Sequence, residues 1–153
     1  MGTAVALELA AKLCRHFEGF SAKPYLCPAN YWTIGYGTVW KPDGKQVTQN
    51  DPPITRDTAE AWLIHELRHN YMAGVLRASP SLIRHPQALG AMTDFAYNLG
   101  VGRYRASTLR KRVDAEDWQG AADELKKWVR GGGRVLPGLV RRRKAEIALF
   151  LNN

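Results

Sequence analysis

Apolar side chains recur every three or four residues in much of this 153-residue chain, the spacing that places them on one face of an α-helix. The first such segment covers residues 5–17, with Val5, Leu9, Leu13 and Phe17 on one side and Ala6 and Ala10 beside them, and Gly19 can end it. A helix of about five turns should start after residue 55, a threonine suited to capping, and reach residue 75. Further helices are expected at residues 86–99, 108–113, 114 or 116 to 129, and 137–151.

A different period appears between residues 24 and 48. From residue 32 to residue 36, large apolar side chains alternate with Thr33 and Gly35, which is typical of a strand. Turn-forming Pro42-Asp43-Gly44 separates this run from Val47. We therefore expect a small, curved antiparallel sheet there, and a flexible loop at the three glycines 131–133.

Strand and helix segments are segregated along the chain, which predicts an α+β fold. The length fits a single domain over residues 1–153, with two lobes. Residues 20–54 would form the β lobe, and residues 55–153 with the N-terminal helix the helical lobe. The long helix from residue 55 would join the lobes, and a cleft between them would have Glu18 at its floor.

The charge of the chain points to an anionic partner. There are 22 Lys and Arg residues against 14 Asp and Glu, a formal net charge of +8. Nucleic acid, a membrane surface or a bacterial envelope would fit, and so would a basic protein with no anionic target. No run of about 18 apolar residues predicts a membrane span, and residues 4–13 lack the basic lead of a secretion signal. We expect a cytoplasmic protein with reduced thiols.

Two motifs suggest other functions. His65-Glu66-Leu67-Arg68-His69 matches the zinc-protease signature, but no third ligand stands at a set distance, so we interpret both histidines as solvated and expect no metal. The basic run 141–144 lacks a helix-turn-helix before it, so nucleic-acid binding is not expected. Residues 139–151 are basic on one side and apolar on the other, which favours packing into the core over stable membrane insertion.

Glu18, Cys27 and Thr33 suit the cleavage of a sugar chain. Such cleavage needs a protonated acid beside the leaving oxygen and a group on the opposite face that holds water or attacks. Glu18 ends a helix, where the helix dipole disfavours a negative charge. Thr33 can position water, and Cys27 can accept a hydrogen bond or act as a base or nucleophile. Aromatic side chains suited to stacking on sugars lie close by in sequence: Tyr25, Tyr31, Trp32 and Tyr36.

Four segments spread over nearly the whole chain form a specific pattern. They are Glu18-Gly19 with residues 33–38, Ile54-Thr55, residues 96–102 with 107–109, and residues 137–140 with Arg142-Arg143 and Glu146. In order and spacing they resemble phage-type lysozymes, the endolysins or muramidases that tailed phages make to open a bacterial wall. The resemblance implies a lysozyme-like fold and no cofactor.

The resemblance also implies roles for single residues. Glu18, Cys27 and Thr33 fit the family's spacing of Glu, eight residues, Asp or Cys, five residues and Thr. Glu18 would be the general acid, and Cys27 with Thr33 would hold the attacking water, giving inversion. A glycosyl-thiol intermediate on Cys27 is the alternative. Many members have Asp where this chain has Cys27.

Other positions would support the acid or touch the glycan. Arg142 or Arg143 would pair with Glu18. Tyr97, Asn98, Ser107 and Thr108 would contact the sugar chain. Cys14 is expected to be a core thiol, and a regulatory Cys14–Cys27 disulfide is the sharper alternative.

The substrate implied is peptidoglycan, cut between N-acetylmuramic acid and N-acetylglucosamine. The protein would act as a monomer, wait in the host cytoplasm, and reach the wall after a holin opens the membrane. Two other functions stay open: a lytic transglycosylase on the same substrate, and a non-catalytic basic protein that binds wall or nucleic acid.

Overall fold

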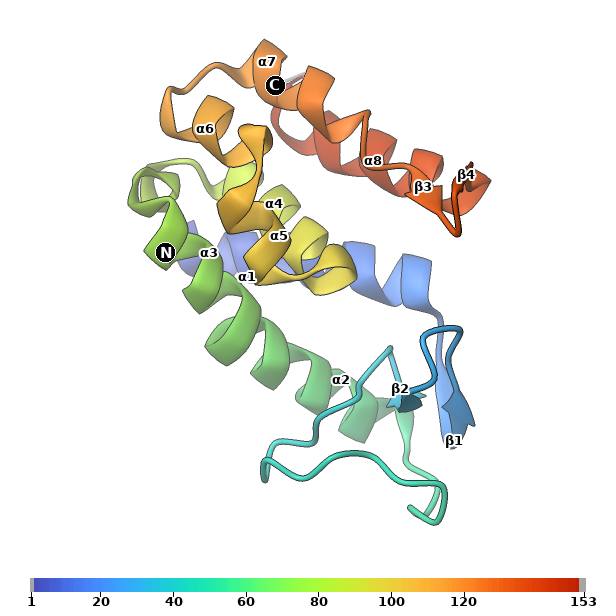
Figure 1. Ribbon diagram of the computed structural model, residues 1–153. Coiled ribbons are helices and arrows are strands. Elements are labelled where there is room, and N and C mark those ends of the chain that lie inside the picture. The colour runs from blue at the N-terminus through green and yellow to red at the C-terminus, as the bar shows by residue number, and fades with distance from the viewer. Residues whose placement is uncertain (1, 152–153) are drawn as a thin grey trace.

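The computed structural model describes residues 2–151 of the protein (Figure 1). The elements of the first part are α1 (Gly2–Glu18), β1 (Ser21–Leu26), β2 (Trp32–Gly35), α2 (Arg56–Glu66), the π-helical η1 (Leu67–Met72) and α3 (Ala73–Ala78). The rest comprises the 3₁₀ segment η2 (Pro80–Arg84), α4 (Pro86–Leu99), α5 (Val101–Ala106), α6 (Thr108–Asp114), α7 (Trp118–Leu125), β3 (Arg130–Gly131), β4 (Arg134–Val135) and α8 (Pro137–Phe150). The α+β class with a small antiparallel sheet is confirmed.

Helix α1 ends as expected, and the small side chains of its expected face are buried more deeply than the large ones. Gly19 takes φ 70° and donates its N–H to the carbonyl of Arg15, which closes the helix at Glu18. The buried face carries the small side chains Ala6, Ala10 and Cys14, whereas Val5 is 50% exposed. The reason is the close approach of α4: a Cβ on Gly90 would lie 3.0 Å from the Cβ of Leu9.

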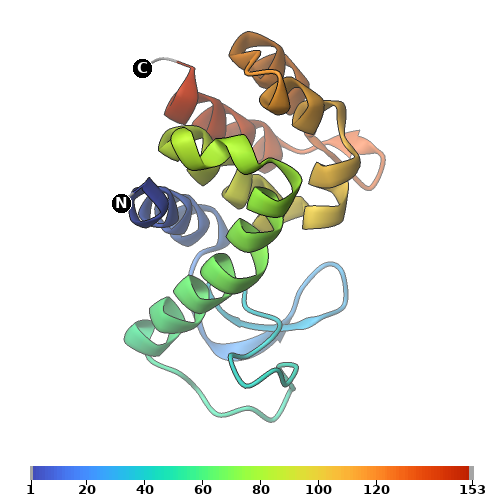
Figure 2. The ribbon, with the colours of Figure 1, turned by 90° about the vertical axis from the view of Figure 1, so that its left-hand side faces the viewer.

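The β lobe is smaller than the pattern predicts. Strands β1 and β2 are antiparallel, with Tyr25 opposite Thr33 and an irregularity between Ser21 and Tyr25. Beyond β2 the expected sheet is reduced to isolated bridges, one of them between Trp40 and Gln46. The lobe therefore consists largely of loops that surround a short hairpin, as Figure 2 shows.

One long helical rod joins the two lobes (Figures 1 and 2). The Thr55 hydroxyl accepts the N–H of Thr58 at 3.1 Å, which confirms the expected N-cap. Segments α2, η1 and α3 follow one another without a break, so the rod runs from Arg56 to Ala78 with a π-helical turn inside it.

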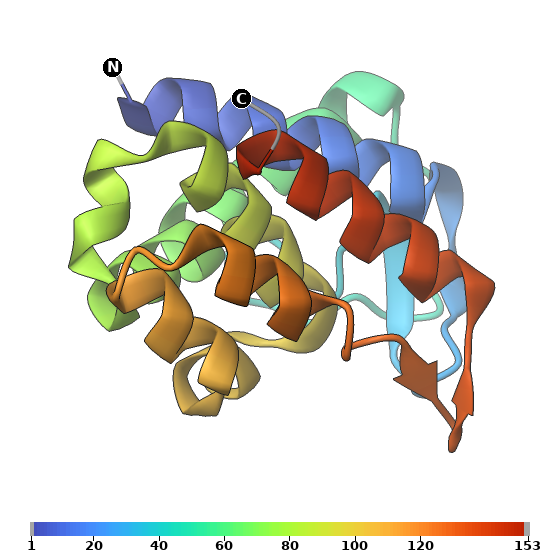
Figure 3. The same ribbon diagram turned by 90° about the horizontal axis from the view of Figure 1, so that it is seen from above.

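Helix α4 is the centre of the helical lobe. Its residues 88–96 are all buried, and α1 and α8 lie along it, side by side in Figure 3. This arrangement brings the end of α1, the end of α4 and the start of α8 to the junction with the β lobe. Within residues 2–151, none of the helices is long and apolar enough to cross a bilayer.

Two expectations in the last third of the chain are wrong. Helix α7 ends at Leu125, because the chain turns there with Trp128 donating its N–H to the Leu125 carbonyl. The glycines at 131–133 form no loose loop: Gly132 and Gly133 take positive φ and form the turn of a β3–β4 hairpin.

Candidate active site

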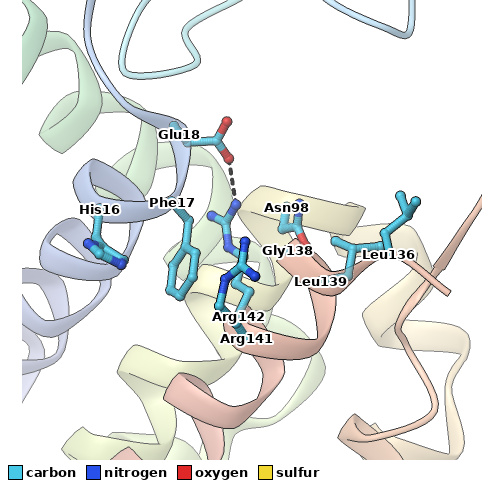
Figure 4. Close-up of a pocket in the computed structure, with 9 residues that line it drawn as sticks. All are labelled: His16, Phe17, Glu18, Asn98, Leu136, Gly138, Leu139, Arg141 and Arg142. Atoms are coloured by element: carbon cyan, nitrogen blue, oxygen red, sulfur yellow. Dashed lines mark hydrogen bonds and ion pairs between the residues drawn. The ribbon is translucent and has the colours of Figure 1, made fainter.

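Glu18 lies at the junction of the two lobes, on the last residue of α1. One of its carboxylate oxygens lies 2.7 Å from Nη1 of Arg142 (Figure 4). The other faces Gly37 of the β lobe, where a Cβ would stand only 2.9 Å away, and Gly37 has φ 81°. Glycine at this position therefore lets the β-lobe backbone approach the acid.

Arg142 holds Glu18 because Asp94 holds Arg142. The guanidinium donates to both carboxylate oxygens of Asp94, at 3.0 Å from Nε and 2.8 Å from Nη2, in a bidentate pair. The Asp94 side chain is fully buried. Burial by itself would raise the pKa of Asp94, but hydrogen bonds from Glu146 and Arg142 and the charge of Arg142 outweigh it and lower that pKa. The hydrogen bonds that link Asp94, Arg142 and Glu18 therefore fix the orientation of the Glu18 carboxyl group.

Cys14 belongs to the same buried network. Its thiol donates to Asp94 at 3.2 Å, and burial together with the Asp94 charge raises the pKa of this thiol. Both cysteines are free in the structure, with Cys14 buried and Cys27 partly exposed. The expectation of a core thiol is confirmed, and the structure forms no Cys14–Cys27 disulfide.

Arg143 points elsewhere than Arg142. It forms an ion pair with Glu146 at 2.8 Å and donates to the side-chain carbonyl of Asn98 at 2.7 Å. Burial and then the proximity of Asp94 raise the pKa of Glu146, and the charge of Arg143 offsets this only in part. Of the two arginines, Arg142 contacts Glu18 and Arg143 orients Asn98.

A pocket of about 460 Å³ opens beside the acid (Figure 4). It is lined by the end of α1, by Asn98 of α4, and by Leu136 with the first turns of α8. Glu18, Asn98 and Arg142 share this pocket, so the structure brings together three of the expected site residues.

Three other expected glycan contacts lie outside the pocket lining. The Tyr97 hydroxyl donates to the Tyr36 carbonyl at 2.7 Å, which ties α4 to the β lobe. The Ser107 hydroxyl caps α6 by accepting the N–H of Arg110 and donates to the Tyr104 carbonyl. Both hydroxyls are used inside the protein, and Thr108 is exposed on the first turn of α6.

Cys27 and Thr33 are positioned by the β hairpin. Cys27 exchanges backbone hydrogen bonds with Asn30 and Tyr31 across the turn. Thr33 is 3% exposed and its hydroxyl donates to the Tyr31 carbonyl at 2.9 Å. Partial burial opposes ionisation of Cys27, but hydrogen bonds to the thiol, above all the one from the Tyr31 backbone, outweigh it and lower the pKa of the thiol.

Tyr25 lies opposite Thr33 on the β hairpin. Burial raises the pKa of its hydroxyl, and the charges of Glu18 and Cys27 raise it further.

The sequence of the chain places it among known proteins. A family model described as phage lysozyme matches residues 15–146. This chain belongs to the phage lysozyme family. Family membership supports a peptidoglycan hydrolase of the endolysin type that serves host lysis.

Individual phage lysozymes and endolysins resemble the whole chain. It is 32% identical over 147 residues to an endolysin of Acyrthosiphon pisum secondary endosymbiont phage 1, which covers 94% of this chain and 95% of that protein. It is 36% identical over 146 residues to an endolysin of Bacillus phage B103; the match covers 94% of this chain but only about half, 53%, of that relative. Among solved structures, an endolysin from Escherichia coli O157:H7 phage FAHEc1 superposes with a TM-score of 0.80 at 28% identity, covering 94% and 91% of the two chains.

The histidine motif of this chain does not form a shared site. The rings of His65 and His69 lie 4.6 Å apart, while Glu66 between them is 4% exposed and turned inward. Burial raises the pKa of Glu66 to about 7, and the nearby Thr38 side chain opposes this only in part. Within residues 2–151, no three His, Cys, Asp or Glu side chains are grouped so that they could hold a metal ion.

Sequence reasoning missed Asp94 and Glu146 as parts of the network around Glu18. Asp94 is the one charged residue in the otherwise uncharged run 86–99, and an ionisable group amid apolar neighbours is seldom buried without a partner. That isolation was the available signal, although it does not say which cation is the partner.

Proposed function

We propose that the protein hydrolyses the bond between N-acetylmuramic acid and N-acetylglucosamine in peptidoglycan, with inversion at the anomeric carbon. The observation that carries the proposal is Glu18 held at the pocket edge by Arg142, 2.7 Å away and itself fixed by Asp94. Glu18 protonates the glycosidic oxygen as the bond to the muramic acid carbon breaks.

Water attacks from the β-lobe side. The Thr33 hydroxyl gives its hydrogen to Tyr31, so its free lone pair accepts a hydrogen bond from that water. Cys27, whose pKa is lowered, takes the proton that the water loses. Between Glu18 and Asp43 there is no Asp or Glu, so the hairpin supplies no second carboxylate to act as a nucleophile. This favours a single displacement by water over a covalent intermediate on a carboxylate.

Residues of the helical lobe would hold the glycan. Arg143 donates to the carbonyl oxygen of the Asn98 side-chain amide. The N–H groups of that amide can therefore donate to a sugar hydroxyl at the pocket. Thr108 would meet the glycan farther along through its exposed hydroxyl. Tyr97 and Ser107 would act indirectly, by fixing the lobe junction and the start of α6.

The route to the wall is a further part of the proposal. The enzyme would work as a monomer and pass from the host cytoplasm through a membrane that a holin has opened. Expression with and without a membrane-permeabilising protein tests this, since lysis should require the second protein.

Product analysis tests the reaction itself. Wild-type protein and the Glu18→Gln variant are incubated with purified peptidoglycan, and the released fragments are examined by mass spectrometry and by NMR at early times. The wild type should yield reducing muramic acid ends of inverted configuration, and the variant none. Anhydromuramic ends would indicate a lytic transglycosylase, and unchanged wall clearing by Glu18→Gln would indicate that Glu18 is not the acid.

A further inference from the structure

The positive charge of this protein is concentrated in one segment. Residues 126–145 contain eight Lys and Arg residues and no Asp or Glu. The whole chain has a net charge of +8, so its other 14 basic residues are matched by its 14 acidic ones. This segment comprises the β3–β4 hairpin and the first half of α8, and part of it lines the pocket beside Glu18.

Half of the eight cations are already paired. Arg142 and Arg143 are buried with carboxylates, and Lys126 and Lys127 pair with acidic residues of α7. Four cations form no ion pair with any described residue: Arg130, Arg134, Arg141 and Lys144. All four are exposed.

Strand geometry separates the two hairpin arginines. Arg134 lies opposite Gly131, and Arg130 lies opposite Val135, so the two arginines are on different faces of the ribbon. Leu136 is two residues after Arg134 with extended backbone, and a Cβ on Gly131 would meet it at 2.5 Å. Leu136 lines the pocket, so the face that carries Arg134 is the pocket face, and the face that carries Arg130 is turned away.

Arg141 continues the same wall on α8. It lines the pocket and its guanidinium lies over the first turn of the helix, 3.8 Å from where a Cβ of Gly138 would be. Figure 4 shows it beside Arg142 on the α8 side of the pocket. The N-terminal end of α8 adds a partial positive charge to this wall.

We propose that Arg134 and Arg141 form a subsite for the carboxylates of the peptide stem that each muramic acid carries. The inference rests on the proposed function, because it takes peptidoglycan to lie in the Glu18 pocket. A muramic acid ring at the scissile bond holds its stem through a lactyl group, so carboxylates reach the wall of the cleft next to the acid. Guanidinium groups match carboxylates in shape and charge.

The test compares the two arginines on the pocket side with an arginine on the outer face of the hairpin. Arg134→Gln and Arg141→Gln are each assayed on purified peptidoglycan, on the same material with amidated stem carboxyls, and on glycan strands stripped of peptide. Each variant should raise KM about threefold on the charged substrate, and the double variant about tenfold, with kcat unchanged. On the amidated and peptide-free substrates, wild type and variants should be alike.

Arg130→Gln is the matched control, with the same charge change on the outer face of the same hairpin. It should leave KM within about 1.5-fold of the wild type on every substrate, as expected for a surface charge without a contact. An equal KM rise in Arg130→Gln would overturn the proposal in favour of general attraction by net charge. An equal rise in KM on amidated and charged stems would overturn it as well. If the rise in KM disappeared on peptidoglycan freed of phosphate polymers, the two arginines would bind phosphate instead of stem carboxylates.

These outcomes are separate from failure of the proposed function. If Glu18→Gln cleared wall as the wild type does, the catalytic assignment would fall whatever the arginine variants show. If Glu18→Gln is inactive and the arginine variants bind and cleave normally, only the stem subsite is wrong.

Discussion

The two sides of the proposed reaction centre are built in different ways. On the helical side, Arg142 joins two carboxylates, one of them fully buried, through three side-chain hydrogen bonds from one guanidinium. On the β side, Cys27 and Thr33 are positioned by a short turn and by backbone carbonyls, and no described ion pair involves either residue. A buried charge network leaves little freedom, whereas a surface hairpin can adjust. The acid should therefore tolerate substitution less well than the residues that hold water.

Two buried carboxyl groups also differ in whether a charged partner is present. Asp94 has a guanidinium partner and its pKa is lowered, while Glu66 lacks a cation and its pKa is raised to about 7 by burial. Glu66 lies on the rod that joins the lobes, with the Thr38 hydroxyl of the β lobe beside it. The difference is the partner and not the degree of burial.

The largest expected effect is on the acid itself. Glu18→Gln should lower the rate of peptidoglycan cleavage by about 10³-fold, because the amide cannot donate the proton. Glu60→Gln on α2 is the control, since that carboxylate is partly exposed and pairs with Arg15 away from the pocket. Cleavage by Glu18→Gln at more than a tenth of the wild-type rate would show that the helical side does not supply the acid.

Breaking the helical network should cost stability as well as activity. Arg142→Met leaves Asp94 buried without its cation, so the free energy of unfolding should fall by about 3–5 kcal/mol in urea titrations. Arg141→Met, an exposed neighbour, should change it by less than about 0.5 kcal/mol. The double variant Arg142→Met/Asp94→Asn should recover part of the loss, and failure to do so would mean that the network is not held by this charge pair.

Glu66 gives a pH dependence of defined sign. Its pKa rises from 4.5 to about 7 on folding, so between these values the folded state binds more protons than the unfolded state. The free energy of unfolding should therefore decrease as pH rises from about 4.5 to about 7, by up to about 3 kcal/mol, and level off above that.

The matched variant for this prediction is Glu66→Gln. It keeps the size of the side chain and removes its titration, so its stability should fall less steeply over the same range. Urea titrations of both proteins at several pH values measure the difference. Parallel curves for the two proteins would show that Glu66 is solvated or paired.

Substitutions on the β side should have smaller effects. Cys27→Ala should lower activity about 10²-fold, since the water loses its proton acceptor, while Cys27→Asp should stay within about tenfold of the wild type. Steady-state cleavage rates with matched thermal unfolding curves provide the test. Full activity in Cys27→Ala would reduce the thiol to a packing role.

The two thiols should differ in reactivity. Cys27 is partly exposed with a lowered pKa, whereas Cys14 is buried with a raised pKa, so iodoacetamide should label Cys27 first. Peptide mass spectrometry after brief exposure of the folded protein measures this, with labelling in urea as the control for Cys14. Labelling of Cys14 at the rate of Cys27 would show that the helical side opens as readily as the β side.

Local signals in the sequence predicted most of the elements. Gly19, Thr55 and Pro137 act through their own backbone or the adjoining turn, so their helix boundaries are readable from neighbouring residues. The short 3₁₀ segment η2 and helix α5 were not anticipated, because five or six residues give too little periodicity. On α1 the small side chains of the predicted face, Ala6 and Ala10, are buried more deeply than the large ones, because close packing on Gly90 favours small side chains over the larger ones that a hydrophobic pattern selects.

The order of residues alone is enough to predict the α+β succession of elements, the spacing of Glu18, Cys27 and Thr33, and the concentration of charge near α8. The folded chain is needed to show that Arg142 and not Arg143 reaches Glu18, 124 residues away, and that Asp94 fixes Arg142. Consecutive helix residues point about 100° apart, so which of two adjacent arginines faces the acid depends on how α8 is rotated against α1 and α4. That rotation is set by contacts between residues far apart in the chain, and no local pattern encodes it.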